Sequence, residues 1–212
     1  MITERSGRDE AYDSPMPQLW SETLETHRLE VREAILDAVG HLVMSRGLLA
    51  VSMSAVAEAT KIGRATLYKY FPDVEEVLTA WHERHVSSHL AALTALRDRG
   101  GTPSARLRKV LAAYGFICQQ RRRHGAGELA GVLHRTERVQ TLQRQLVELV
   151  AELISGAAGE GVVRGDIPAQ ELAAFAIHAL GAADDVASGA ALDRLVDVVW
   201  SGLAQPRELT DQ

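Results

Sequence analysis

Basic, hydroxyl and aromatic side chains that could contact a polyanion gather in one short stretch of this sequence. Three basic residues, Lys61, Arg64 and Lys69, fall between Thr60 and Phe71, and no acidic residue separates them. An arginine can form two hydrogen bonds with a guanine edge, a threonine can touch a thymine methyl, and lysine, tyrosine and serine suit phosphates. Three basic residues taken alone are more often a solvated helix face, but if this stretch forms a DNA-reading helix, Arg64 is the best candidate to read a base. The predicted DNA-contact set is Ser52, Ser54, Arg64, Ala65, Thr66, Tyr68, Lys69 and Tyr70.

These side chains need a helix to present them, and the surrounding residues predict one. Ser52, like the serine two positions later, is a suitable N-cap for a first short helix. Residues 60–63 form a break that ends in a glycine, and residues 64–70 form the second helix. Leu67 and Phe71, four positions apart, would face inward. Two helices joined by a tight turn, the second with an outward basic face, are typical of a helix-turn-helix.

The order of residues in this stretch resembles the DNA-binding signature of the TetR family of transcriptional regulators. The resemblance rests on SMSAVA after Val51, on TLYKYF from Thr66 to Phe71, and on EEVL from Glu75. It extends over Arg28 to Trp81. Lys61 stands where the family usually has the turn glycine. The resemblance implies a homodimer that binds a palindromic operator, most often a repressor that a small-molecule effector releases from double-stranded DNA.

Helical periodicity continues along the whole chain, so the sequence predicts an all-α protein of about nine helices. A helix-turn-helix DNA-binding domain would be followed by a larger helical ligand-binding and dimerisation domain. Asp73 would cap the helix that connects the two. The expected division is a flexible tail (1–20), a DNA-binding domain (21–72), a connecting helix (73–89) and an effector-binding and dimerisation domain (90–212).

The second domain has amphipathic residues in the middle of its helices that could line an effector pocket. The inward stripes of these helices contain few strong charges, which favours an apolar or amphipathic effector. Residues of these types at such positions are more often ordinary core than ligand contacts. The candidates are Trp81, His85, Tyr114, Cys118, Phe175 and His178.

Three histidines, His82, His85 and His89, follow one another on roughly one helix face, and histidines can share a metal ion. The segment WHERH from Trp81 is one residue short of the zinc-protease spacing HExxH, so we expect neither that chemistry nor any metal or cofactor. The basic run at 121–124 closes a helix, where it would offset the helix dipole in solvent.

Two other classes of function remain open. An all-helical enzyme would need a clustered catalytic set, and Asp184, Asp185 and His178 form no coherent triad. A ligand-independent DNA-binding or adaptor protein would need no cavity.

The composition agrees with a helical cytoplasmic protein. The 212 residues have a formal net charge of −5, so any attraction to DNA must be local. Cys118 is the single cysteine, which excludes an intramolecular disulfide. Residues 1–18 do not have the composition of a signal peptide, and no stretch is apolar enough to span a bilayer.

Overall fold

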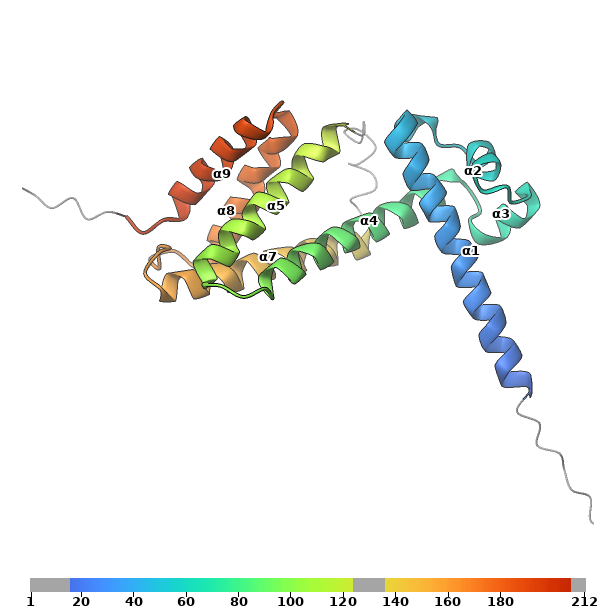
Figure 1. Cartoon of the computed structure of the whole chain (residues 1–212), viewed down its shortest axis with the longest axis horizontal. Helices are drawn as coiled ribbons and strands as arrows, with labels where there is room; N and C mark the ends of the chain where they lie inside the picture. Colours follow the sequence, from blue (N-terminus) through green and yellow to red (C-terminus); the bar gives the residue numbers. More distant parts are fainter. Residues whose placement is uncertain (1–15, 124–135, 207–212) are drawn as a thin grey trace, which may run out of the picture.

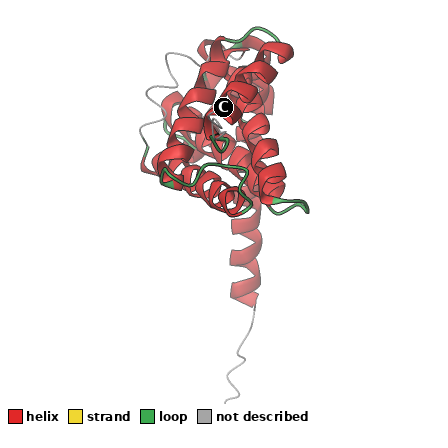
Figure 2. Cartoon of the chain, turned by 90° about the vertical axis from the view of Figure 1, so that its left-hand side faces the viewer, coloured by secondary structure: helices red, strands yellow, loops and turns green. Residues whose placement is uncertain are grey.

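The computed structural model describes residues 16–123 and 136–206, and its regular structure in these ranges is helical (Figures 1 and 2). The prediction of an all-α protein is confirmed. The expected short helix at 127–134 lies outside the described residues. In the described ranges no helix has both the length and the apolarity needed to cross a membrane. The elements are α1 (Met16–Arg46), η1 (Leu48–Ala50), α2 (Met53–Thr60), α3 (Arg64–Tyr70), α4 (Val74–Arg97), α5 (Pro103–Arg123), α7 (Glu137–Gly159), α8 (Ala169–Gly181), η2 (Ala182–Asp185) and α9 (Gly189–Leu203).

The first helix is longer than its periodicity predicts. We expected it to begin at Ser21 or Thr26, whereas α1 begins at Met16. Pro17 is compatible with this start because the first turn of a helix needs no backbone N–H from a proline. The N-terminal turns of α1 project away from the rest of the molecule (Figure 2).

A small core joins α1, α2, α3 and the start of α4. Ile35 and Val39 on α1 are buried with Leu67 and Phe71, as the spacing of these residues predicts. The guanidinium carbon of Arg32 on α1 lies 5.1 Å from the centre of the Phe71 ring. This cation-π contact holds the end of α3 against α1. Apolar contact with α1 therefore fixes the orientation of α3.

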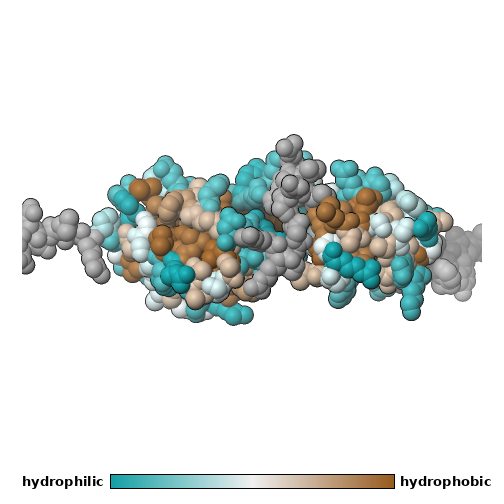
Figure 3. Space-filling model, turned by 90° about the horizontal axis from the view of Figure 1, so that it is seen from above, coloured by the Kyte–Doolittle hydropathy of each residue, from teal (hydrophilic) through white to brown (hydrophobic). Residues whose placement is uncertain are grey.

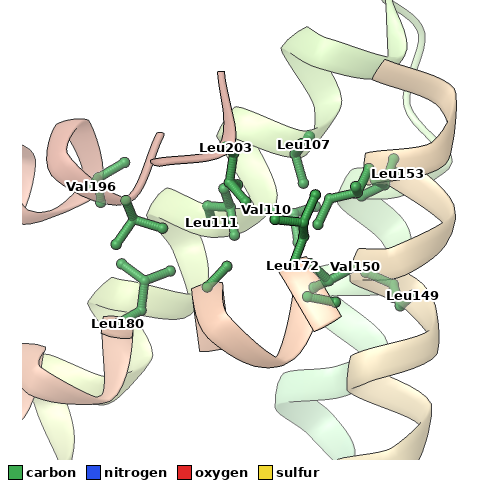
Figure 4. Close-up of a cluster of buried hydrophobic side chains, with 14 of the residues drawn as sticks. Leu107, Val110, Leu111, Leu149, Val150, Leu153, Leu172, Leu180, Val196 and Leu203 are labelled. Carbon is green, nitrogen blue, oxygen red and sulfur yellow. The ribbon is translucent and has the colours of Figure 1, made fainter. Parts of the chain in front are cut away.

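A second, larger core lies among α5, α7, α8 and α9, and α5 runs through its middle (Figures 1 and 4). The side chains that meet there are mostly leucine, valine and alanine, so burial of apolar surface drives this packing. Thr102 caps α5 as predicted, because its hydroxyl accepts a hydrogen bond from the Ala105 N–H at 3.2 Å. The labelled members are Leu107, Val110, Leu111, Leu149, Val150, Leu153, Leu172, Leu180, Val196 and Leu203.

The eighth helix is shorter than predicted. We expected it to reach Ser188, but α8 ends at Gly181, and the 3₁₀ turn η2 follows. The amide of Gln119, a buried residue of α5, donates to the carbonyls of Val186 and Ser188, both at 3.1 Å. Because these carbonyls bond to a side chain on another helix, the chain can leave the helix here, and Ser188 then caps α9.

The glycines at 156, 159, 161 and 165 predict a break in the chain, but Gly156 does not form one. It lies within α7, which continues to Gly159. A Cβ atom at Gly156 would lie 2.9 Å from Cβ of Pro103, the first residue of α5. The missing side chain therefore lets α7 approach α5 closely.

Candidate functional site

Ser52 and Ser54, at the start of α2, have different roles. Ser52 is the N-cap, and its hydroxyl accepts a hydrogen bond from the Ala55 N–H at 3.2 Å. Ser54 lies inside α2, so the expectation that it could cap the helix is corrected. Its hydroxyl accepts a hydrogen bond from the Arg64 guanidinium. This contact links the exposed start of α2 to the first residue of α3.

The turn between α2 and α3 places a positive φ on a residue with a side chain. Lys61 has φ 58° and ψ 19°, in the left-handed region, whereas Gly63 has φ −58°. Thr60 supports the turn: its hydroxyl donates to the Val56 carbonyl at 2.8 Å and accepts from the Ile62 N–H at 3.3 Å. Lys61 therefore adopts the backbone conformation that glycine adopts most easily.

The outward face of α3 presents most of the predicted contact residues together. Arg64 and its two successors are exposed, as are Lys69 and Tyr68, whose exposed fraction is 51%. Tyr70 differs from the prediction, because it is half-buried against the small N-terminal core. The surface formed by Arg64, Ala65, Thr66, Tyr68 and Lys69 is called the α3 face below.

The connecting helix α4 is fixed at its start and along its side. Asp73 caps it as predicted by accepting a hydrogen bond from the Glu76 N–H at 2.8 Å. Two turns later, Arg84 forms ion pairs with Glu33 at 2.6 Å and Asp37 at 2.8 Å, both on α1. A displacement of α4 would therefore move α1 with it.

A cavity of about 130 Å³ lies where α1, η1, α4, α5 and α7 meet. Met44 and Leu48 contribute from the N-terminal helices, and Leu142 closes the side formed by α7. Its lining includes four of the six predicted effector residues: Trp81, His85, Tyr114 and Cys118.

Phe175 and His178 do not line this cavity, so their assignment to it is corrected. Both are exposed on α8. His178 Nδ1 lies 2.7 Å from the Ala174 carbonyl of its own helix. The Phe175 ring lies over Gly202 of α9, where a Cβ atom would come within 3.1 Å of it. The apolar stripe of α8 is broad enough to reach the surface, and the sequence alone does not separate its two sides.

The cavity wall on α4 is aromatic. The rings of Trp81 and His85 stack with centroids 5.2 Å apart, and the His85 and His89 rings meet edge to face at 4.2 Å. Burial, followed by His85 and Arg121, lowers the pKa of His89 to about 4, so its imidazole is neutral at pH 7.

The wall on α5 combines a phenol, a thiol and a cation. Burial is the main reason why the pKa of Tyr114 and that of the Cys118 thiol are both raised, which leaves both groups protonated at neutral pH. Arg121 also lines the cavity, although its position in a basic run suggested a solvated helix end. Its Nε lies 3.6 Å from Asp184 Oδ1. The signal that could have revealed it is the spacing of four and then three residues from Tyr114 to Cys118 to Arg121, which places all three on one helix face.

The three histidines His82, His85 and His89 all border the cavity. Across residues 16–123 and 136–206, no group of three or more His, Cys, Asp or Glu side chains is arranged to hold a metal ion. The three histidines form part of the cavity wall.

Comparison with known families and structures agrees with this arrangement. Residues 35–80 match the family model described as "Bacterial regulatory proteins, tetR family". Residues 118–205 match the one described as "Transcriptional regulator SbtR-like, C-terminal domain". A comparison with curated protein sequences finds no match.

Solved structures resemble this chain over most of its length. A TetR-family regulator from Pectobacterium atrosepticum is 24% identical with a TM-score of 0.70, covering 86% of this chain and 98% of its own. A TetR/AcrR-family regulator from Thermobifida fusca is 17% identical with a TM-score of 0.70, covering 83% and 100%. The regulator FadR from Bacillus subtilis, solved in complex with stearoyl-CoA, is 11% identical with a TM-score of 0.62, covering 81% and 98%.

The fold and the α3 face define a helix-turn-helix DNA-binding protein with a helical second part. Both family matches agree with this class and cover the two parts in turn. The chain belongs to the TetR family of transcriptional regulators. These are non-enzymatic DNA-binding proteins, so the enzyme alternative is set aside.

Proposed function

We propose that this regulator is a repressor that binds a palindromic operator as a homodimer and is released when a small molecule occupies the cavity. Residues 21–72, with the preceding turns of α1, would form the DNA-binding domain. The remainder of α4 would connect it to an effector-binding and dimerisation domain that begins near residue 90. Release then requires that the effector bind the DNA-free arrangement more tightly than the DNA-bound one.

The observation that carries this proposal is that both parts of the molecule form the cavity wall. Trp81 belongs to the small N-terminal core and also lines the cavity. Met44 and Leu48 meet the cavity from the N-terminal side, and Tyr114 meets it from α5. A molecule bound there would contact both parts at once, so its binding energy can depend on their relative position.

Size limits the effector. A cavity of about 130 Å³ is below the range of about 300–1,000 Å³ that is common for ligand pockets. The related FadR was solved with stearoyl-CoA. That relative supports the general idea of a small-molecule effector, and the volume favours a much smaller one here.

The DNA contacts would come from the α3 face with the start of α2. Arg64 would contact a guanine through two hydrogen bonds, exchanging its hydrogen bond with Ser54 for contacts to the base. Thr66 would touch a thymine methyl. Tyr68, Lys69, Tyr70, Ser52 and Ser54 would contact phosphates, and Ala65 would let the backbone approach the groove.

Arg64→Ala tests this assignment of base reading. We expect it to cost about 1–3 kcal/mol of binding to the preferred sequence and to relax discrimination at one base pair. Lys69→Ala is the matched control, because loss of a phosphate contact weakens binding to all sequences alike. Competition binding with single-base operator variants separates the two. Equal loss on every sequence for Arg64→Ala would show that Arg64 reads no base.

The homodimer would form through the outer surfaces of α8 and α9. Phe175 is 48% exposed and Val198 is 68% exposed, so much of their apolar surface faces away from the rest of the described chain. Apolar atoms gather on the side of the molecule where α8 and α9 lie (Figure 3). Exposed apolar surface on two packed helices suits a contact with a second copy.

A substitution that fills the cavity tests the effector site. Ile117 lines the cavity from α5, and Ile117→Trp would occupy space that a ligand needs. We expect the variant to bind operator DNA but to resist release by compounds that release the wild type, as measured by fluorescence anisotropy of labelled DNA. Equal release of the wild type and the variant would show that the effector binds outside this cavity.

A further inference from the structure

Apart from the phenol of Tyr114 and the thiol of Cys118, which stay protonated at neutral pH, the ionisable side chains around the cavity are basic. Among the residues described, the lining contains His82, His85 and His89 together with Arg121, and it contains no aspartate or glutamate. His89 is neutral at pH 7, so Arg121 supplies the permanent charge on this wall. The electrostatic field inside the cavity therefore favours a negative group over a positive one.

Arg121 has donor capacity beyond its present partner. Its side chain is 37% exposed, so its head group lies at the edge of the cavity. Its contact with Asp184, 3.6 Å from Nε to Oδ1, is longer than a normal hydrogen bond. That Nε is buried and has no hydrogen-bond partner among the described residues. A guanidinium has five N–H donors, so it can hold a carboxylate in addition to this weak pair.

The rest of the cavity fits an aromatic body. Trp81 stacked on His85 forms a flat wall, and Tyr114 and Leu142 add further carbon surface. The volume of about 130 Å³ is close to that of an engineered protein cavity of about 150 Å³ that binds benzene. One aromatic ring with a short side chain is the size that matches.

We propose that the cavity binds a small aromatic carboxylate, with its ring against Trp81 and its carboxylate at the Arg121 guanidinium. This inference rests on the proposed function, because it names the effector class of the same cavity. The neutral imidazole of His89, which lines the same cavity, can donate one further hydrogen bond. A cationic ligand of the same shape would meet Arg121, and no aspartate or glutamate of the described lining would receive it.

A matched set of three probes tests the proposal on the full-length protein: phenylacetate, phenylacetamide and 2-phenylethylammonium. They share a ring and a short chain and differ in charge. Isothermal titration calorimetry at pH 7 should give an affinity for phenylacetate at least tenfold higher than for the amide, and no binding of the ammonium ion.

Two variants assign this preference to Arg121. Arg121→Gln should lose at least tenfold in phenylacetate affinity and keep its affinity for the amide, whereas Arg121→Lys should retain part of the preference. Arg144→Gln on α7 is the control, because Arg144 is an exposed arginine that donates to Thr141 and does not line the cavity. Thermal melts followed by circular dichroism identify any variant that fails to fold, in which case the probe series on the wild type decides.

Three outcomes overturn the inference: equal or tighter binding of the amide, binding of the ammonium ion, or no binding by any of the three. DNA release, measured separately on a selected operator, distinguishes this failure from failure of the proposed function. Release by a neutral or cationic molecule would uphold the effector site and reject the anion. Phenylacetate binding that leaves the DNA bound would uphold the anion site and reject its role as effector site.

Discussion

Lys61 combines two properties that do not usually occur at one position. Its φ of 58° is unfavourable for a residue with a Cβ atom, yet it brings a positive charge to the turn between α2 and α3. Glycine would adopt this turn more easily but would bring no charge. The lysine therefore exchanges some stability for positive charge beside the α3 face.

Lys61→Gly should separate these two effects. We expect the free energy of unfolding to rise by about 0.5–1 kcal/mol, because relief of the left-handed backbone exceeds the extra unfolded-state entropy of glycine. The slope of DNA affinity against salt should fall by about one charge per subunit, and so by about two for the proposed homodimer. Lys69→Gln, within a regular helix, should lower the salt slope without raising stability in urea unfolding. A destabilised Lys61→Gly would show that the turn conformation is not strained.

His89 makes the stability of the helical part depend on pH. Its pKa in the folded protein is about 4, below the ordinary value of 6.5, because of burial and then of His85 and Arg121. The unfolded chain therefore binds a proton at higher pH than the folded one. The stability that the neutral imidazole contributes to the folded protein is fully present above about pH 6.5, and it is lost as the pH falls towards 4.

His89→Gln should make this dependence shallower. We expect the wild-type melting temperature to fall between pH 6.5 and pH 4 more steeply than that of the variant, in melts followed by circular dichroism. His41→Gln, which removes an exposed histidine of α1, should retain the wild-type slope. Parallel curves for wild type and His89→Gln would mean that this imidazole titrates normally.

At the scale of elements, the packing of α7 against α5 depends on the missing side chain of Gly156. The neighbouring atoms are Cβ and Cγ of the Pro103 ring, 2.9 Å and 3.2 Å from where a Cβ would lie. A proline ring cannot rotate away as a leucine side chain can. Gly159, three residues later on the same helix, has nothing within 4 Å of such a Cβ.

Gly156→Val should therefore lower the free energy of unfolding by about 1–3 kcal/mol, since α5 and α7 must move apart. Gly159→Val should change stability by only about 0.5 kcal/mol. Urea denaturation of both variants provides the comparison. If the two substitutions lower the free energy of unfolding equally, the close approach of α5 and α7 does not require glycine at position 156.

Four helix starts, those of α2, α4, α5 and α7, were predictable because each depends on a local side chain. Ser52, Asp73, Thr102 and Thr136 each accept a hydrogen bond from the N–H three residues later. The end of α8 was not predictable in this way. It depends on Gln119, a residue of α5 far away in the sequence.

The candidate site follows the same division. The inward positions of α3 followed from a four-residue spacing, whereas the half-buried position of Tyr70 depends on how closely α3 approaches the neighbouring core. Trp81 and Tyr114 were identified as cavity candidates by residue type and mid-helix position. Arg121 was missed because a charged residue near a helix end normally faces solvent. Its location in the cavity wall results from the way three helices converge.

At the scale of the whole molecule, binding to a palindrome requires two copies in a fixed relation. Val198 on the outer side of α9 is 68% exposed, and we expect it to be covered in the dimer. Val198→Asp would then bury an unpaired charge, which is costly enough to separate the copies. Size-exclusion chromatography with light scattering at micromolar concentration should show a dimer for the wild type and a monomer for the variant.

Leu29→Asp is the control for this experiment. Leu29 is 60% exposed on α1, away from the proposed contact, and its substitution should leave the dimer intact. A Val198→Asp protein that still elutes as a dimer would place the subunit contact on another surface.

The measurement that tests the central claim most directly is selection of bound sequences from a random duplex DNA pool, at moderate salt, by the full-length protein. The account predicts enrichment of an inverted repeat whose half-sites lie about one helical turn, or a small multiple of it, apart. Binding with a steep salt dependence and no enriched sequence would mean that the protein is attracted only to the phosphates of the DNA backbone. That result, or the absence of binding, would contradict the account of the α3 face as a sequence-reading surface.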